Sequence, residues 1–529
     1  MSDRFDLAIV GAGFSGSLLA AVARRLGLSV VLLEKGAHPR FAIGESSSPL
    51  ANLLLEEICD RYGLDRIKPL TAWGTWRRAY PEVNCGLKRG FTFYAHVPGQ
   101  PFGADSQRGD QLLVAASPCD EVADTHWYRA DFDRFLAEEA AREGAEYLDR
   151  TEIEHAAFNP GSTELATVRL GRRLTLRARF VVDASGPRGF LHRALGLPEA
   201  AFPDLPATEG LYTHFSGVRR IGEMGILPGT EEPPYPPDDA ALHHVFPGGW
   251  VWVLRFADGT TSAGVAAVPG LARDLVFEDG EAAWQRLLSR LPTVREQFAN
   301  ARAVQPFVHA RRLPFRSGVV AGPGWALLPS AAAFVDPLLS TGFPLTLLGI
   351  QRLARLFEAG LPGPDLEAGL DDYARATLAD ADAAALLVSA LYTFFDDFPV
   401  FAALTHLYFA AASYTEAVTR LNRSAPRRSF LLREDPAFGP GFFRLCRAAI
   451  AAARQGGFDP EERDGWLGEL RRTVAGRDVA GLGRAERRNW HPVDPRDLLE
   501  GAGKLGASRG DVEALLETWF PANPRVPVE

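Results

Sequence analysis

The chain has 529 residues, of which 47% are hydrophobic and 23% are charged, and its formal net charge is -9. This length exceeds what a single ordinary core organises, so we expect two or three domains with ample buried area. A mildly acidic balance excludes a surface that attracts nucleic acid or an anionic membrane. The cysteines, at positions 59, 85, 119 and 446, lack the paired spacing of zinc sites and disulfide frameworks. We therefore expect a cytoplasmic protein without a bound metal.

Targeting and membrane-spanning segments are not expected. The first apolar run, Leu7 to Gly13, is too short for a signal peptide and ends in glycines. The longest apolar-leaning run, Ala383 to Phe395, falls short of the roughly 20 residues that cross a bilayer.

The N-terminal segment has the pattern of a dinucleotide-binding turn. A short apolar run, Phe5 to Val10, meets the sequence GAGFSG, which is followed by a helical pattern, a second strand and Glu34. In this pattern Gly11 makes a tight turn, Gly13 admits a pyrophosphate, Gly16 allows close helix packing and Glu34 binds ribose hydroxyls. The sequence therefore predicts a Rossmann-type nucleotide site.

A second strand-and-turn segment, FVVDASG at Phe180 to Gly186, follows some 150 residues later. This separation favours FAD over NAD, because it suits an FAD domain interrupted by an inserted region. The predicted fold class is α/β, with a Rossmann-type FAD-binding domain, an inserted mixed β-sheet substrate domain and a C-terminal helical region.

Several of these pieces together resemble the family of single-component FAD enzymes, which includes aromatic hydroxylases, geranylgeranyl reductases and flavin-dependent halogenases. The matching pieces are GAGFSG, Glu34, PRFAIGES at Pro39 to Ser46, DASG, and an Asp-Pro turn within Ala331 to Gly360. In the family the PRFAIGES segment resembles a strap between flavin and substrate, whereas the residues alone are equally consistent with a polar loop. In the family an arginine early in the corresponding helix approaches FAD, and Arg129 and Arg134 are the candidates in this chain. Each arginine is equally consistent with the solvated face of an amphipathic helix.

The resemblance implies a set of FAD contacts in this chain. They are Gly11, Gly13, Phe14, Ser15, Gly16, Glu34, Lys35, Arg40, Ser46, Arg129, Asp183, Gly186, Ser330, Pro337, Thr341 and Gly342. No second glycine fingerprint is present, which leaves room for a flavin that is reduced by a separate reductase and then delivered.

The segment Gly86 to Tyr94 alternates strongly and predicts a strand. By periodicity alone, Lys88 is a solvent-facing lysine on a half-buried strand. The resemblance gives another interpretation, since flavin-dependent halogenases carry a lysine on this strand, which makes Lys88 the candidate catalytic residue.

The inserted region, from Phe190 to Ala310, contains strand-like runs at Leu211 to Val218, His243 to Phe256 and Thr261 to Val268, with an exposed proline-rich loop expected at Pro228 to Pro237. Trp250 and Trp252 project to one face of a strand, where they could simply be a core anchor. They also resemble the WxWxIP signature of halogenases, which implies that they separate substrate from flavin. Leu254 replaces the isoleucine of this signature and Arg255 replaces its proline.

The stretch Ala331 to Gly360 predicts a tight turn running into a helix, with Ser340 and Thr341 as candidate caps and Pro344 in the first turn. Phe334, Pro337, Ser340 and Gly342 fit FxxPxxSxG, the halogenase pattern beside the flavin. The resemblance implies that the Thr341 and Gly342 amides hold a halide, and that Phe334, Ser340, Trp250 and Trp252 line a tunnel. Two departures are Leu339, where tryptophan halogenases carry a glutamate, and Ser330, where an acid usually meets the flavin.

The last 170 residues are rich in helical patterns, at Tyr373 to Phe395, Phe401 to Leu421 and Phe442 to Ala453. The basic stretches RRTVAGR and GRAERRNW, at 471–477 and 483–490, predict a solvated face. We expect an FAD-binding domain over residues 1–360, interrupted by substrate-binding segments at about 75–125 and 190–310, followed by a helical region over 361–529.

The expected function is an FADH2- and O2-dependent halogenase that transfers chloride or bromide, as hypohalous acid, to an electron-rich phenol- or pyrrole-like ring. The ring would be free or tethered to a carrier, a flavin reductase would supply reduced FAD, and the chain would be a monomer or homodimer. The alternative is an FAD-dependent monooxygenase or prenyl-chain reductase, which Arg255 and Ser330 favour. The substrate, the choice of halide and the general base stay open.

Overall fold

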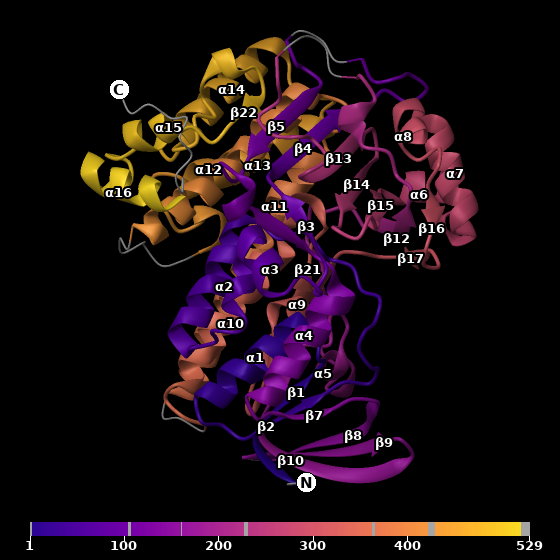
Figure 1. The fold of residues 1–529 in the computed structure, drawn as a ribbon, viewed down its shortest axis with the longest axis vertical. Coiled ribbons are helices and arrows are strands. Elements are labelled where there is room, and N and C mark those ends of the chain that lie inside the picture. Colours follow the sequence, from indigo (N-terminus) through magenta and orange to yellow (C-terminus); the bar gives the residue numbers. More distant parts are fainter. Residues whose placement is uncertain are drawn as a thin grey trace.

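The computed structural model describes residues 3–103, 107–159, 161–226, 231–361, 365–421 and 429–519. Part of the proline-rich loop expected at 228–237 therefore lies outside the described residues. The molecule is elongated, with a nucleotide-binding sheet near the N-terminus, a second large sheet at the opposite end, and the C-terminal helices packed beside that second sheet (Figure 1).

The first sheet is the predicted Rossmann layer. Its central strands run parallel in the order β20-β10-β1-β2-β7. These strands are β20 (Trp325–Leu327), β10 (Arg172–Asp183), β1 (Arg4–Val10), β2 (Val30–Leu33) and β7 (Glu146–Leu148). Helix α1 (Phe14–Arg25) follows the glycine turn. The central strands carry near-continuous apolar runs because both faces of the sheet are buried, and the predicted fold class is confirmed.

Two consecutive hairpins precede the second half of β10. Strands β8 (Thr151–Asn159) and β9 (Ser162–Arg169) pair with each other, and β9 pairs antiparallel with the first half of β10. The second half of β10 then joins β1, so this long strand carries the chain from the hairpins back into the Rossmann layer.

The second sheet combines segments that are far apart in the sequence. Its order is β16-β12-β15-β14-β13-β4-β5-β22, with β17 also paired to β12. The strands are β4 (Gly90–Ala95), β5 (Gln111–Ala115), β12 (Glu209–Ser216), β13 (Ala241–Phe246), β14 (Gly249–Arg255), β15 (Thr261–Ala267), β16 (Arg302–Ala303), β17 (Val308–Ala310) and β22 (Trp490–His491). Strand β13 runs parallel to β4, so the two inserted segments of the sequence form one sheet.

Two sequence-based strand predictions are wrong in detail. The run from His243 to Phe256 is a hairpin, because the chain reverses between β13 and β14 with Gly248 at a φ of 86°. The run from Gly86 to Tyr94 is two strands in different sheets, since β3 (Cys85–Lys88) pairs with β6 (Asp124–Trp127) while β4 joins the large sheet. The first break carries a turn signal, Pro247-Gly248-Gly249, whereas the alternation continues through the second break, which is why periodicity alone does not detect that one.

The C-terminal half is helical, as expected, and packs against both sheets. Its main helices are α10 (Gly342–Phe357), α11 (Leu366–Tyr392), α12 (Phe398–Arg420), α13 (Gly439–Arg454) and α14 (Pro460–Ala475). Helix α2 (Pro49–Tyr62), from the N-terminal half, lies against α10 and α12. Among the described helices, none has the length and apolarity needed to cross a membrane.

Candidate functional site

The glycine turn between β1 and α1 has the geometry of a nucleotide site. Gly11 has a φ of 102°, and a Cβ there would lie 2.7 Å from the Ala184 carbonyl oxygen. Only glycine fits that position, because a residue with a side chain is strained at such a φ and because the Ala184–Ser185 backbone occupies the space that a Cβ would need. Gly13 caps α1 without a side chain, which leaves the helix start open to an anion.

Glu34, at the end of β2, holds this turn in place. Its carboxylate accepts hydrogen bonds from the Ala12 amide at 3.0 Å and from the Gly36 amide at 2.9 Å. Lys35, predicted beside it, is exposed. Asp183 is buried and accepts hydrogen bonds from the Ser185 amide and hydroxyl, at 2.8 and 2.6 Å. It therefore shapes the second turn from within.

Two arginines face the glycine turn and behave differently. Arg129, on α4 (Arg129–Arg142), is fixed by two hydrogen bonds to Asp133, at 2.7 and 2.8 Å, and by a third to the Gly44 carbonyl at 3.1 Å. The Arg40 guanidinium has only long contacts, 3.8 Å to Glu34 and 3.9 Å to Asp133, and its Nε has no partner among the described residues. A guanidinium held loosely beside Gly13 fits the pyrophosphate of FAD.

A cavity of about 350 Å³, here the large cavity, opens from this turn and runs to the start of α10. It brings together most of the residues predicted from the sequence. The predicted residues that line it are Gly13, Phe14, Ser15, Arg40, Ser46, Arg129, Gly186, Trp250, Trp252, Ser330, Phe334, Pro337, Ser340, Thr341 and Gly342. Ser330, at the position where an acid was expected, shares a hydrogen bond of 3.3 Å with Ser15 across the cavity wall.

The turn before α10 is strained. Leu339 and Ser340 have φ values of 63° and 54°, a left-handed conformation that costs side-chain-bearing residues energy. Thr341 occupies the N-cap position of α10, as predicted, but its side chain makes no capping hydrogen bond. Leu339 is fully buried. The turn exposes Ser340, Thr341 and Gly342 to the large cavity, and the carboxylates that line this cavity are Asp336 and Glu45, with none at position 339.

A buried network that the sequence did not indicate supports this turn. Asp336 accepts hydrogen bonds from the Tyr392 hydroxyl at 2.9 Å and from the Leu338 amide at 3.0 Å, and Tyr392 in turn accepts from the Trp250 indole at 3.0 Å. Burial raises the pKa of Asp336 to about 6, against the lowering effect of these hydrogen bonds. The tryptophan wall and the turn before α10 are therefore joined through one carboxylate.

Arg255, which stands where the halogenase signature has proline, lies at the end of β14. Its guanidinium donates to Asp238 at 3.1 Å and to the Val218 carbonyl at 3.1 Å, and it does not line the large cavity. It ties two loops together, so this departure from the signature leaves the cavity wall unchanged.

Lys88 is fully buried at the end of β3, which corrects the solvent-facing interpretation from periodicity. Its Nζ donates to the Ser46 hydroxyl at 2.8 Å and to the Ser47 carbonyl, and it lies 3.5 Å from the Ser340 hydroxyl. It also lies 3.8 Å from the centre of the Phe91 ring. Burial lowers the pKa of Lys88 below its usual range. The lysine thus contacts the strap and the turn before α10 at once.

Asp124 faces Lys88 across the β3–β6 pair. Its Oδ1 accepts a hydrogen bond of 2.9 Å from Asn52, and its buried Oδ2 has no partner among the described residues. Burial raises the pKa of Asp124, and the nearby lysine charge opposes this effect. Sequence reasoning missed Asp124 because the two residues are 36 positions apart and become neighbours only through strand pairing.

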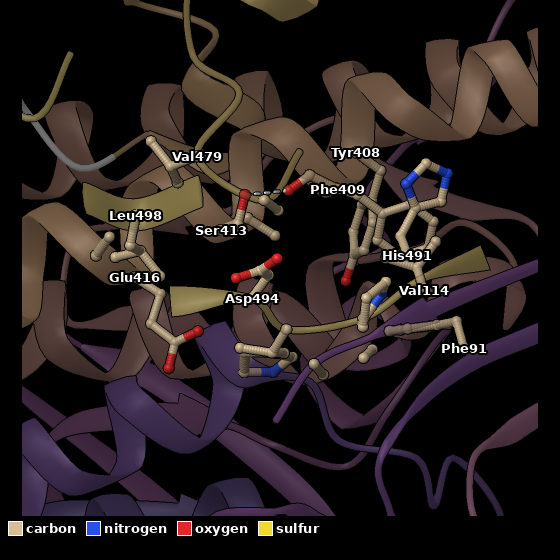
Figure 2. Close-up of a pocket in the computed structure, with 18 of the residues that line it drawn as sticks. Phe91, Val114, Tyr408, Phe409, Ser413, Glu416, Val479, His491, Asp494 and Leu498 are labelled. Carbon is tan, nitrogen blue, oxygen red and sulfur yellow. Dashed lines mark hydrogen bonds between the residues drawn. The ribbon is translucent and has the colours of Figure 1, made fainter. Parts of the chain in front are cut away.

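A second cavity, of about 80 Å³ and here called the small cavity, is lined in part by Phe91 (Figure 2). Its lining residues come from α2, β4, β5, α12 and the segment that contains β22. The named members used below are Phe91, Tyr408, Phe409, Glu416, His491 and Asp494. Lys88 lines neither cavity, but its Nζ lies 3.8 Å from the centre of the Phe91 ring, which lines the small cavity, and 3.5 Å from the Ser340 hydroxyl, which lines the large cavity.

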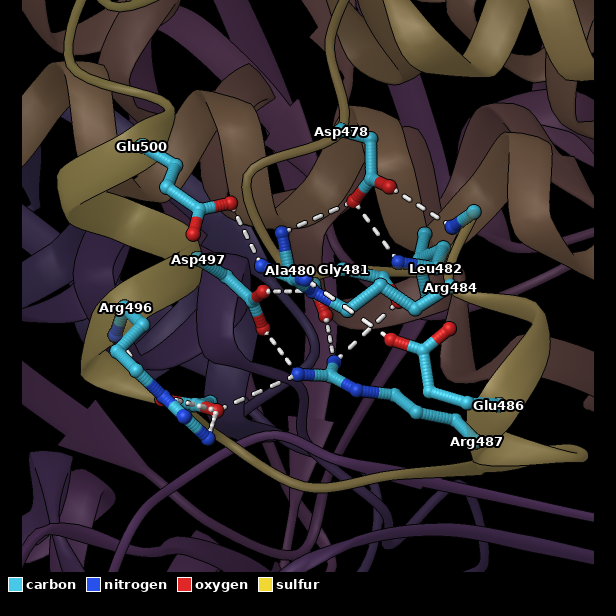
Figure 3. Close-up of polar contacts among 12 residues, drawn as sticks. Asp478, Ala480, Gly481, Leu482, Arg484, Glu486, Arg487, Arg496, Asp497 and Glu500 are labelled. Carbon is cyan, nitrogen blue, oxygen red and sulfur yellow. Dashed lines mark hydrogen bonds and ion pairs between the residues drawn. The ribbon is translucent and has the colours of Figure 1, made fainter.

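The C-terminal wall of the small cavity is fixed by ion pairs (Figure 3). Arg487 and Arg484 both pair with Asp497, at 2.5 and 2.7 Å. The side chain of Arg487 is only 9% exposed, so the predicted solvated basic face is wrong at this residue. These pairs hold the loop from Val479 to Leu482 against α15 (Pro495–Glu500), which positions the cavity wall.

Comparison with known proteins decides the family. A family model described as tryptophan halogenase matches residues 123–397, more than half of the 529-residue chain. The chain belongs to the flavin-dependent halogenases of this family. A second model, for an NAD(P)-binding Rossmann-like domain, matches residues 9–49. The halogenase resemblance inferred from the sequence is confirmed.

Individual halogenases show the same relation. The monodechloroaminopyrrolnitrin halogenase of Pseudomonas fluorescens is 30% identical over 413 residues, which cover 77% of this chain and 71% of the relative. The tetracycline 7-halogenase of Kitasatospora aureofaciens is 31% identical over 370 residues, covering 68% of this chain and 64% of the relative. The crystal structure of halogenase PltM with phloroglucinol and FAD superposes with a TM-score of 0.82 at 25% identity, covering 92% of this chain and 99% of the other.

These relations establish an enzyme, a flavin-dependent halogenase that uses FAD, and they favour halogenation over the alternative of a monooxygenase or prenyl-chain reductase. Three features of this chain fit FAD: the glycine turn, the loosely held Arg40 beside it, and the large cavity that opens from the turn.

Proposed function

We propose that this halogenase binds FAD in the large cavity, binds an electron-rich aromatic ring in the small cavity, and uses Lys88 between them to direct hypohalous acid onto the ring. The observation that carries the proposal is the position of Lys88, which is fully buried, 3.5 Å from Ser340 on one side and 3.8 Å from the Phe91 ring on the other. Residues 1–360 then hold the flavin and Lys88, and the helical region over 361–529 completes the acceptor side.

When bound, reduced FAD supplies the electrons with which O2 oxidises a halide to hypohalous acid. In this chain, Gly11, Gly13 and the α1 start accommodate the pyrophosphate, Arg40 neutralises it, and Glu34 faces the ribose. Arg129 is already saturated by Asp133 and two carbonyl groups, so its role is to hold the strap that carries Ser46.

The amides of Thr341 and Gly342 are proposed to hold chloride or bromide. They lie where α10 begins and line the large cavity, so the partial positive charge of a helix start favours an anion there without offering a side chain that reacts with it. The buried network of Asp336 and Tyr392 keeps the preceding strained turn in place.

The Lys88 ammonium is proposed to donate a hydrogen bond to hypohalous acid and so polarise it toward the ring. Three oxygen acceptors, from Ser46, Ser47 and Ser340, surround its Nζ and favour the protonated form, as does the facing Asp124. The tryptophan wall of Trp250 and Trp252 limits access of water and acceptor to the flavin side.

The acceptor is proposed to be a phenol- or pyrrole-like ring, and a separate flavin reductase is proposed to deliver reduced FAD. Related proteins include a chlorinase for a pyrrole attached to a peptidyl carrier protein and a structure that contains phloroglucinol, so both ring types occur within the family. The absence of a carboxylate at Leu339 favours a ring that carries its own activating group.

One incubation tests the proposal. The protein, FAD, a flavin reductase, NADH and bromide are combined with a panel of phenols, pyrroles and indoles, and products are examined by mass spectrometry for the bromine isotope pattern. Brominated phenols or pyrroles are expected. Addition of oxygen or hydrogen without bromine, for every member of the panel, would contradict it.

A further inference from the structure

The small cavity is narrow and follows one face of α12. Tyr408, Ala412 and Glu416 line it at four-residue intervals, so the cavity extends about 12 Å along the helix axis. In Figure 2, Tyr408, Phe409 and Phe91 lie toward one side and Glu416 toward the other. Its volume of about 80 Å³ is well below that of sites for drug-sized ligands. It therefore suits one ring whose far end approaches Glu416.

The far end of the small cavity is acidic. Among its described lining residues, Glu416 and Asp494 carry carboxylates and none is lysine or arginine. Asp494 is already committed, since it caps α15 and pairs with Arg496 at 2.8 Å, which lowers its pKa. Arg496 and Arg420 offset these carboxylates from outside the lining, so an anionic ring would meet carboxylates but no lysine or arginine in the cavity wall itself.

Glu416 is less completely paired. One of its oxygens accepts from the Arg420 guanidinium at 3.1 Å, and Arg420 also pairs with Glu56 of α2 at 3.2 Å. Burial raises the pKa of Glu416, with Arg420 opposing this effect. A half-buried carboxylate that shares its arginine with another acid retains capacity to accept a further hydrogen bond.

His491 gives an independent indication that the cavity receives a polar ligand. The side chain is 2% exposed and lines the cavity, and its one polar contact among the described residues is with the Gly481 backbone, which leaves at least one ring nitrogen without a partner. Burial lowers the pKa of His491 to about 3, so the ring is neutral and offers one donor and one acceptor. Buried polar atoms are normally paired, which makes this histidine a candidate ligand contact.

We propose that the small cavity selects uncharged single-ring phenols, and that Glu416 accepts the hydrogen bond, and then the proton, of the phenolic hydroxyl. This inference rests on the proposed function, because it assigns the acceptor of the same reaction. Glu416 then supplies, from α12, the carboxylate that the turn at Leu339 does not carry.

The step balances without a further reagent. The hydroxyl proton moves to Glu416 as a ring carbon attacks the halogen of hypohalous acid, and the hydroxide that leaves takes a proton from Lys88 to become water. The ring hydrogen then leaves as a proton to Lys88, and Glu416 returns its proton to the phenol oxygen. The net change converts a ring C–H bond and hypohalous acid into a C–halogen bond and water.

The test compares Glu416→Gln with Glu56→Gln, which changes the other carboxylate on Arg420 outside the cavity. Binding of resorcinol to the full chain is measured by calorimetry, together with 3,5-dihydroxybenzamide and its anionic counterpart 3,5-dihydroxybenzoate. Glu416→Gln is expected to weaken resorcinol binding ten- to hundred-fold, the range for a hydrogen bond to a charged group. Glu56→Gln is expected to change it by less than three-fold. The wild-type protein is expected to bind the benzoate at least ten-fold more weakly than the benzamide.

Turnover gives a second readout. Glu416→Gln should lower kcat for resorcinol but leave that for 1,3-dimethoxybenzene, which has no hydroxyl proton, within three-fold of wild type. Resorcinol binding unchanged in Glu416→Gln, or equal wild-type binding of benzoate and benzamide, would overturn the inference. If the wild-type protein halogenates none of these rings, the proposed function fails, and the binding measurements still decide the role of Glu416.

Discussion

Replacing Asp124 by asparagine should lower the pKa of Lys88 and move the alkaline limit of halogenation to lower pH. Burial lowers the pKa of Lys88 to about 7, and the facing carboxylate works against that shift. Opposed residues of an antiparallel pair have Cβ atoms within about 5.5 Å. At a charge separation of about 6 Å and an effective dielectric constant of about 20, the attraction is about 3 kcal/mol, or about two pH units.

The other charged groups near this pair leave the direction of the shift unchanged. Burial lowers the pKa values of His126 and His243 to about 3, so both stay neutral in the working range. Glu416 and Arg420, on α12, carry opposite charges and pair with each other. Asp124 is therefore the principal counter-charge of the buried lysine. Because its own pKa is also raised to about 7, the expected shift is between one and two pH units.

The assay is the pH profile of bromination of resorcinol, with oxidation of reduced FAD followed in the same samples. At pH 7, a fall of one to two units reduces the ammonium fraction of Lys88, and hence bromination, by about 5- to 50-fold. Flavin oxidation should be unchanged. The control is Asn52→Ala, which removes a hydrogen bond to Asp124 but keeps the charge, and it should move the profile by less than about half a unit. A profile for Asp124→Asn that superposes on wild type, or moves to higher pH, would refute the reasoning.

Three further variants test the flavin side. Gly11→Ala should abolish retention of FAD, measured by bound-flavin absorbance, because a Cβ there lies 2.7 Å from a carbonyl oxygen. The control Gly27→Ala is also at positive φ but in open space, so it should lower the free energy of unfolding by about 1 kcal/mol and keep FAD. Arg40→Ala should weaken FAD binding by about ten-fold or more in a fluorescence titration, and the affinity for FAD should then depend less on salt concentration. Arg134→Ala, on an exposed helix face, should leave the affinity for FAD unchanged in that titration. Tyr392→Phe should lower the free energy of unfolding by about 1–3 kcal/mol in urea, because it removes the buried hydroxyl that donates to the Asp336 carboxylate and accepts from the Trp250 indole, and an unchanged midpoint would contradict this.

The nucleotide half of the molecule was predictable because its signals are local. Gly11, Gly13, Gly16 and Glu34 fall within one strand-turn-helix-strand unit, and their roles follow from backbone geometry over 24 residues. The structure places the turn as expected and adds the loosely held Arg40, whose availability depends on distances that a sequence does not contain.

The acceptor side was harder to predict because it is assembled from distant segments. Lys88 is identified as a candidate only through the family resemblance, because the alternating pattern of its segment predicts solvent exposure. That prediction assumes one continuous strand, whereas the chain changes sheet between β3 and β4. Asp124 and Glu416 carried no signal at all. Each takes its proposed role from a tertiary neighbour, Asp124 from strand pairing with Lys88 and Glu416 from the small cavity that it lines.

The central claim is that Lys88 directs hypohalous acid onto the ring without taking part in flavin oxidation. The most direct measurement is a single turnover of Lys88→Met with reduced FAD, O2, bromide and resorcinol, in which flavin oxidation and bromoresorcinol are quantified together. The control, Lys68→Met, replaces an exposed lysine that pairs with Asp60 on the surface. We expect normal flavin oxidation in both variants, and a loss of bromoresorcinol of at least 100-fold only in Lys88→Met, on the order of other single catalytic contacts. Bromination retained by Lys88→Met at the wild-type level would contradict the account.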